Sequence, residues 1–241
     1  MVWLAQGWGR GDFSSRACVF FDFDGTVANT VDGIKRTARD TLLARGLSDE
    51  EIGDVGCVIG PAFPGAFEQV YGMSAEEAEA VTEDYRRRYD LLGPGAYAAY
   101  GGVPELLERL RAAGRWLCLT TSKRQDLVTR QATENGLVGL FDRVIGQRGP
   151  GHDTKPLLVG ESIEAAGGDP ARCVMVGDRF HDAEGAEENG IPCVGVTWGA
   201  GTADELAAAG AAALVDTPGE LAALLLGERD MTVSPLARPL R

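Results

Sequence analysis

The sequence has few cysteines, and their arrangement excludes two common kinds of small-protein architecture. Its 241 residues contain five cysteines, an odd number without the paired spacing of a zinc site. Four of them lie in or beside apolar segments that read as strands. We therefore expect buried thiols in a reducing cytoplasm, and no disulfide framework.

Basic residues are also scarce. Lys and Arg number 23 against 36 Asp and Glu, which gives a formal net charge of -13. A field of this sign repels nucleic acids and anionic membranes, so we expect neither a nucleic-acid polymer nor a membrane as a partner. An anionic substrate would need a cation placed locally at its site.

The two ends of the chain lack the features of targeting segments or packed elements. Residues 1–16 have no basic start and no sustained apolar stretch, which excludes a secretory signal and a membrane span there. We expect 1–16 to be a loose N-terminal arm, 228–241 to be a flexible tail, and the protein to be cytoplasmic. The remaining length suits one large domain or a core with an insert, as a monomer or a homodimer.

An apolar run, residues 18–21, ends abruptly at Asp22, Phe23, Asp24, Gly25 and Thr26. The run lacks the alternation of a half-exposed strand, so we predict a strand buried on both faces. Ligand crevices of open α/β sheets form at the carboxyl ends of the strands, where these acids stand. Strand alternation puts both carboxylates on one side, close enough to share a cation.

The segment from residue 29 to residue 100 has helical periodicity and no strong strand. Its clearest helices are predicted over 31–45 and after Ser74, where Ser74 and Glu77 form a capping box. A wholly helical block between the first two strands indicates an inserted α-helical cap domain over 29–100.

Strands and helices alternate from residue 101 onward. With residues 17–28, the stretch 101–227 predicts an α/β core with a doubly wound, Rossmann-like parallel sheet. Further strands are predicted at 116–120, 143–145, 173–176, 192–196 and 213–215. Polar residues follow two of them, Thr121 and Ser122 after the first and Asp178 and Asp182 after the third, while a glycine-rich loop carries Lys155.

Taken together, these positions resemble the four motifs of the haloacid dehalogenase superfamily of phosphohydrolases. The family's Asp-x-Asp-Gly-Thr is present whole at 22–26, its strand-end Thr or Ser matches Thr121, its lysine matches Lys155, and its Gly-Asp with a later Asp matches Asp178 and Asp182. The sequences at 59–61, 177–182 and 195–199 look most like phosphoglycolate-phosphatase-like members with a small helical cap.

This resemblance implies a mechanism through an aspartyl-phosphate. Asp22 would be the nucleophile, and Asp24 would protonate the leaving group and later deprotonate water. Thr121, Ser122 and Lys155 would bind the phosphoryl oxygens.

The resemblance also implies Mg²⁺ as the cofactor. Its ligands would be the Asp22 carboxylate, the Asp24 backbone carbonyl and Asp178, with waters completing the octahedron. Asp182 would be either a direct ligand or an acceptor that orients one.

The expected substrate is a small phosphomonoester, and its identity stays open. Phosphoglycolate, a nucleoside 5'-monophosphate and a phosphorylated biosynthetic intermediate all suit such a core. A sugar phosphomutase and a non-catalytic binding protein are the rival functions. A dehalogenase is disfavoured because its chemistry needs no acid at Asp24. Two positions depart from the family pattern: Asn29 stands where an acid is frequent, and Ser122 stands where phosphoglycolate-type members often have Asn.

Overall fold

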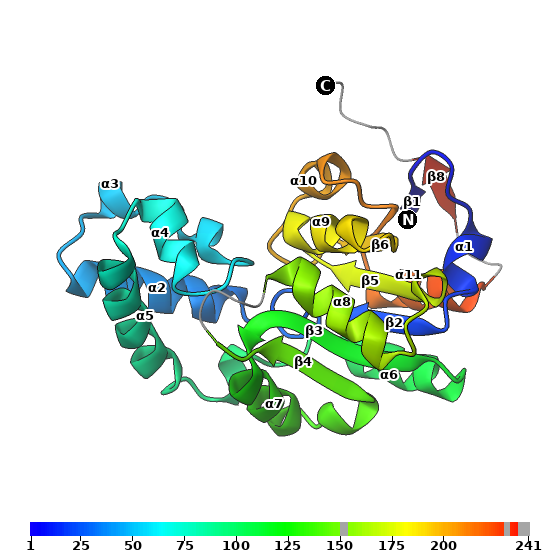
Figure 1. Cartoon of the computed structure of the whole chain (residues 1–241), viewed down its shortest axis with the longest axis horizontal. Helices are drawn as coiled ribbons and strands as arrows, with labels where there is room; N and C mark the ends of the chain where they lie inside the picture. Colours follow the sequence, from blue (N-terminus) through cyan, green and yellow to red (C-terminus); the bar gives the residue numbers. More distant parts are fainter. Residues whose placement is uncertain (150–153, 229–231, 236–241) are drawn as a thin grey trace.

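A computed structural model describes residues 1–149, 154–228 and 232–235. Figure 1 shows a sheet domain with helices on both faces and a wholly helical part beside it, at the left of the view. The predicted α/β fold with a doubly wound, mainly parallel sheet is confirmed.

Within the described residues, the sheet has eight strands in the order β4-β3-β2-β5-β6-β7-β1-β8, and only the β1–β7 pair is antiparallel. The apolar run identified in the sequence is β2, an interior strand flanked in register by β3 and β5. The strands are β1 (Val2–Leu4), β2 (Cys18–Phe21), β3 (Trp116–Arg124), β4 (Arg143–Gln147), β5 (Cys173–Gly177), β6 (Cys193–Val196), β7 (Ala213–Val215) and β8 (Val233–Pro235).

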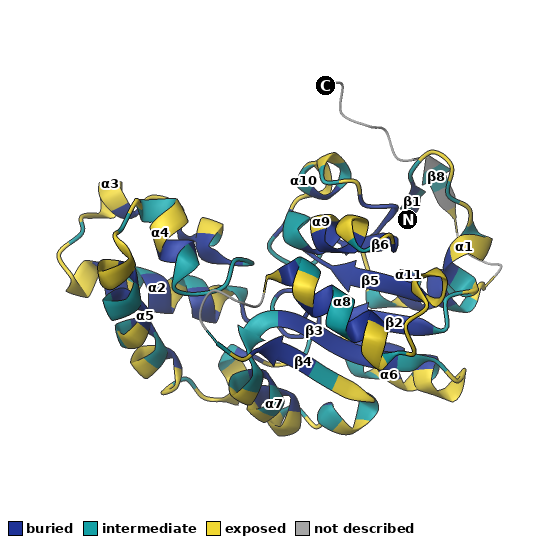
Figure 2. Cartoon of the chain, viewed as in Figure 1, coloured by how far each residue is buried: buried dark blue, intermediate teal, exposed yellow. Residues whose placement is uncertain are grey.

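Both faces of the sheet are covered, which explains why β2 is apolar throughout. Val19 and Phe21 belong to one core cluster, and Cys18 and Phe20 to another. Figure 2 shows the strands as the most buried part of the molecule. The first cluster is covered by α1 (Arg10–Ser14), α6 (Val103–Ala112), α7 (Gln125–Glu134) and α11 (Pro218–Leu226), with η3 (Val138–Leu140) beside them. The other face carries α8 (Lys155–Ala165), α9 (Phe180–Glu188) and α10 (Ala203–Ala208), and η4 (Pro170–Arg172) precedes β5.

Every regular element between β2 and α6 is helical, and the helices from residue 31 to residue 89 share an apolar core of their own. The capping box is present, because Ser74 Oγ accepts a hydrogen bond from Glu77 N at 3.3 Å. We call the helical segment the cap. Its elements are α2 (Val31–Ala44), α3 (Asp49–Ile52), η1 (Val55–Val58), α4 (Gly65–Tyr71), α5 (Ala75–Tyr89) and η2 (Pro94–Ala96).

The two chain segments that join the cap to the sheet domain pair with each other. Asn29 N donates to Ala98 O at 2.8 Å, and Tyr100 N donates to Val27 O at 3.0 Å. This short antiparallel ladder brings entry and exit of the cap to one place beside the end of β2.

Three expectations about local structure are corrected. Residues 1–16 form β1 and α1 instead of a loose arm, because Val2 and Leu4 are buried and β1 lies between β7 and β8. Part of the expected tail is β8, paired with β1, whereas 229–231 and 236–241 lie outside the described residues. Lys155 is the first residue of α8, not a loop residue. In the described part of the chain, no helix combines the length and the apolar character needed to span a membrane.

Candidate active site

Asp22 directly follows β2 and lies at the base of the candidate site. Its backbone N donates to Val176 O at 2.9 Å, which continues the β2–β5 pairing past the last strand residue. Its carboxylate Oδ1 accepts a hydrogen bond from Lys155 Nζ at 2.6 Å. Burial raises the pKa of Asp22 to about 6, and nearby Lys155 limits the rise.

Lys155 is a buried cation shared by two carboxylates. Its Nζ lies 2.8 Å from Asp182 Oδ1 and donates to Thr120 O at 3.1 Å. Burial by itself would lower the pKa of Lys155, but Asp182 and Asp22 raise the pKa above its ordinary value. Lys155 is therefore not exposed to solvent at the surface, which is the usual environment of a lysine.

Asp178 follows β5 and is completely buried. Thr26 Oγ1 donates to its Oδ1 at 3.0 Å, and Ala200 N donates to its Oδ2 at 2.7 Å. Burial, with Asp182 and Asp22 adding to it, raises the pKa of Asp178 to about 8.

Glycine is required around this carboxylate. A Cβ on Gly25, whose φ is +81°, would lie 2.2 Å from Asp178 Oδ2, and a Cβ on Gly199 would lie 2.4 Å from the same atom. The Gly25 of the Asp-x-Asp-Gly-Thr sequence thus allows Asp178 to approach the end of β2.

Asp182 has two structural roles at once. Its Oδ2 accepts a hydrogen bond from Arg179 N at 3.1 Å and caps the start of α9. Its buried Oδ1 faces Lys155 and has no hydrogen bond of regular geometry within the described residues. One oxygen therefore satisfies the helix terminus while the other is directed into the site.

Three buried carboxylates meet here. Each of Asp22, Asp178 and Asp182 offers an oxygen, and these atoms lie within 4.8 Å of one another. A single lysine in their midst leaves excess negative charge, which a divalent, oxygen-binding cation such as Mg²⁺ would neutralise. These residues can hold the expected metal. The Asp24 side chain is not part of this group, so its place as a ligand through the backbone carbonyl stays a prediction.

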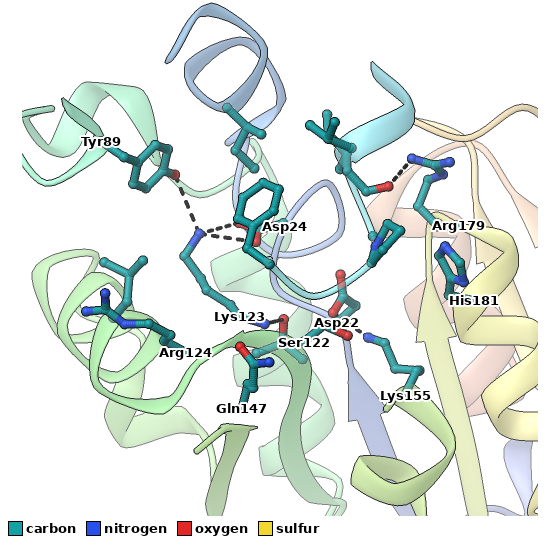
Figure 3. A pocket seen from close by; sticks show the side chains of 18 of the residues that line it. Asp22, Asp24, Tyr89, Ser122, Lys123, Arg124, Gln147, Lys155, Arg179 and His181 are labelled. Atoms are coloured by element: carbon teal, nitrogen blue, oxygen red, sulfur yellow. Dashed lines mark hydrogen bonds and ion pairs between the residues drawn. The ribbon is translucent and has the colours of Figure 1, made fainter. Parts of the chain in front are cut away.

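The carboxylate of Asp24 is instead paired with Lys123, a residue to which the sequence analysis assigned no role. Lys123 Nζ lies 2.8 Å from Asp24 Oδ1 and 3.1 Å from Oδ2, and it donates to the hydroxyl of Tyr89 at 3.5 Å (Figure 3). Burial lowers the pKa of Lys123, but Asp24 and Tyr89 more than offset this and raise it. The one feature of the sequence that could have indicated a role for Lys123 is its position at a strand end, directly after Thr121 and Ser122.

The predicted phosphate-binding residues lie on the same edge. Thr121 is buried, with its Oγ1 accepting a hydrogen bond from Lys123 N at 3.3 Å, and Ser122 is half-buried. The strand extends further than predicted, to Arg124, with an irregular register between Thr120 and Arg124. Both hydroxyl residues line a cavity together with Asp22 and Lys155.

The cap forms the opposite wall of this cavity, and that wall is mainly apolar. Phe63 and Tyr85 meet edge to face with centroids 4.7 Å apart, and Tyr85 stacks on Tyr89 at 5.5 Å. The apolar lining residues from the cap are Ile34, Val58, Ile59, Pro61, Phe63, Tyr85 and Tyr89, and Leu127 of α7 lies in the lining beside them.

Arg179 and His181 connect the acidic site with the cap. The Arg179 guanidinium donates to the carbonyl oxygen of Ile59, and its Nε donates to Glu205 Oε1 at 2.8 Å. His181 packs against Gly60, and burial lowers its pKa to about 4. Both side chains line the cavity (Figure 3).

Comparison with known proteins agrees with this geometry. The profile of the family described as haloacid dehalogenase-like hydrolase matches residues 19–196. A 5'-nucleotidase of Pseudomonas aeruginosa is 32% identical over 79% of this chain and 86% of its own length. A phosphoglycolate phosphatase of Caulobacter vibrioides is 30% identical over 76% of this chain and 80% of its own length.

Among solved structures, a predicted phosphatase from Clostridium acetobutylicum superposes with a TM-score of 0.83 at 28% identity, covering 89% of this chain and 100% of that one. The family profile spans the strand ends that carry Asp22 and Asp178, and it includes Lys155 at the start of α8. The chain therefore belongs to the haloacid dehalogenase-like hydrolase family.

Proposed function

We propose that this protein is a Mg²⁺-dependent phosphatase that hydrolyses a small phosphomonoester through an aspartyl-phosphate on Asp22. The observation that carries the proposal is the meeting of Asp22, Asp178 and Asp182 at one sheet edge, with Lys155 paired to Asp22 and Asp182, beside a cavity that the cap also lines. The relatives named as phosphatases and the family profile support the same reaction class.

In the first step, a carboxylate oxygen of Asp22 attacks phosphorus, and the bond from phosphorus to the ester oxygen breaks. Lys155 is placed to attract the phosphoryl oxygens as negative charge grows on them. Asp24 lines the same cavity and gives its proton to the leaving alkoxide. The products of this step are the free alcohol and the aspartyl-phosphate.

In the second step, water attacks the same phosphorus and Asp24 takes the proton that the water loses. The bond between phosphorus and Asp22 breaks, which releases inorganic phosphate and restores the carboxylate. When bound to Asp22, Asp178 and Asp182, Mg²⁺ would neutralise part of the negative charge between the nucleophile and the phosphoryl group.

Two substrate classes suit the site, and a specific observation favours the second. A phosphoglycolate-type substrate agrees with the Caulobacter relative and with the sequence resemblance. A nucleoside 5'-monophosphate agrees with the Pseudomonas relative and with the cap wall, because aromatic side chains such as Phe63 can pack against a planar base.

A phosphate-release screen with Mg²⁺ tests both the proposed reaction and the proposed substrate classes. The panel contains 2-phosphoglycolate, the nucleoside 5'-monophosphates, sugar phosphates and p-nitrophenyl phosphate. We expect stoichiometric phosphate release from at least one natural phosphomonoester. Isomerised sugar phosphate without phosphate release would establish a phosphomutase, and no turnover on any member of the panel would contradict the proposal.

A further inference from the structure

Asp24, Lys123 and Tyr89 form one contact between three separate parts of the chain. Asp24 follows β2, Lys123 lies near the end of β3, and Tyr89 is the last residue of α5 in the cap. Figure 3 shows the Lys123 ammonium directed between the Asp24 carboxylate and the Tyr89 hydroxyl. The ammonium also lies over the Tyr89 ring, 5.0 Å from its centroid, and 5.7 Å from that of Phe23.

The contact is buried, and it involves both oxygens of the Asp24 carboxylate, each of which keeps a second lone pair for the proton. The side chain of Lys123 is 6% exposed and that of Asp24 is 18% exposed. Both oxygens of Asp24 are within 3.1 Å of the same nitrogen. Among the described residues, Lys123 is the one cation paired with this carboxylate. A side chain held at both oxygens has little rotational freedom, so its orientation toward the cavity depends on Lys123.

The two buried lysines of the site therefore serve different aspartates. Lys155 contacts Asp22 and Asp182, whereas Asp24 is the one acid paired with Lys123 in the part of the chain that the structure describes. Lys155 and its partners all belong to the sheet domain, but Lys123 also reaches the cap through Tyr89. Tyr89 is itself fixed by stacking on Tyr85 within the core of the cap.

We infer that Lys123 is a positioning residue that holds Asp24 for proton transfer and, through Tyr89, makes this orientation depend on the closed cap. The inference rests on the proposed function, in which Asp24 is the acid and base. With the cap displaced, Lys123 would stay beside Asp24 but would lose the Tyr89 hydroxyl and ring, so its ammonium and the Asp24 carboxylate would be held by fewer contacts. Proton donation would thus be efficient only when the cap excludes water from the cavity.

The test compares two substrates that differ in their need for a proton. An alkyl phosphate must receive a proton on its leaving oxygen, whereas p-nitrophenolate leaves without one. Lys123→Met removes the charge and keeps most of the volume. We expect kcat/KM for the alkyl phosphate to fall about 10- to 100-fold, and kcat/KM for p-nitrophenyl phosphate to change less than about threefold. The ratio of the two values is the readout, because loss of folded protein lowers both equally.

A second variant keeps the test decisive if Lys123→Met is unstable. Tyr89→Phe removes only the hydroxyl, and we expect the same selective loss at about two- to fivefold, the size of one modest hydrogen bond. The matched control is Arg130→Met. Arg130 also bridges the sheet domain and the cap, through Asp90 at 3.0 Å, but its side chain is 45% exposed and the pair does not include Asp24. We expect this control to leave both substrates within about twofold of the wild type, as for other exposed ion pairs.

Three results would contradict the inference or its basis, and they are distinguishable. An equal loss on both substrates in Lys123→Met would make Lys123 a substrate-binding or structural residue. If Arg130→Met lost activity on the alkyl phosphate as selectively as Tyr89→Phe, the effect would come from any contact between the cap and the sheet domain, and not from Lys123 and Tyr89 in particular. A wild-type protein that releases phosphate from neither substrate would overturn the proposed function itself.

Discussion

The sheet edge and the cap wall face the same cavity with opposite chemistry. The sheet edge presents buried charges: Asp22, Asp178 and Asp182 lie together, and Lys155 is paired with Asp22 and Asp182. The cap presents aromatic and aliphatic side chains such as Phe63 and Tyr85 that belong to, or pack against, its own apolar core. From this difference we predict that the nucleophile and the metal site depend on the sheet edge and that substrate choice depends on the cap wall. Apart from the Tyr89 contact with Lys123, changes to the two parts should have separable effects.

The largest expected effect comes from the nucleophile at the sheet edge. Asp22→Asn removes the attacking carboxylate, so kcat should fall by at least about 10⁴-fold, as for other essential nucleophiles. Phosphate release measures the rate, and mass spectrometry should show no phosphorylated protein. Asp32→Asn, which changes an exposed acid in the first turn of α2, is the control and should keep the wild-type rate. A near-normal rate in Asp22→Asn would replace the covalent mechanism by direct attack of water.

The next largest effect should come from removing the metal, whose proposed ligands all lie at the sheet edge. Excess chelator should bring turnover below detection and added Mg²⁺ should restore it, because the uncompensated carboxylates repel the phosphate. Added Mg²⁺ should raise the melting temperature of the wild type but not that of Asp178→Asn, which lacks one buried ligand. Full activity in excess chelator would remove the metal from the mechanism.

The cap wall should affect selectivity more than chemistry. Phe63→Ala removes an aromatic contact surface from the cavity, and we expect kcat/KM for the natural substrate to fall about 10- to 100-fold, the range for lost apolar substrate contacts. Hydrolysis of p-nitrophenyl phosphate should stay within about threefold of the wild type, since the acids and Lys155 are unchanged. Equal losses on both substrates would show that the cap wall also supports the catalytic groups.

The smallest expected effect concerns the stability of the cap. Ser74→Ala removes the side chain that caps α5, which should cost about 1 kcal/mol and lower the melting temperature by about 2–4 °C. Because Ser74 is remote from the acids in the chain and from the cavity lining, kcat should be unchanged. Thermal unfolding followed by circular dichroism measures the shift. A large loss of kcat would mean that the start of α5 controls the sheet edge as well.

Three residues of the candidate site could be placed from the sequence because each follows a locally recognisable strand. Asp22, Thr121 and Asp178 stand where continuous apolar runs end, and carboxyl ends of parallel strands meet at one edge of a sheet. The capping box at Ser74 likewise depends on residues three positions apart. Local patterns of this kind are sufficient to predict the α/β fold and the inserted helices.

Tertiary structure alone decided the remaining features, because each depends on partners that are remote in sequence. Val2–Leu4 is a strand only because β7 and β8, from the opposite end of the chain, lie on either side of it. The pairing of Lys123 with Asp24 joins residues 99 positions apart, and Tyr89 reaches the same ammonium across the boundary between cap and sheet. The sequence pattern of a charged residue at a strand end is the same whether its side chain is solvated or buried. Only tertiary packing determines which carboxylate it contacts.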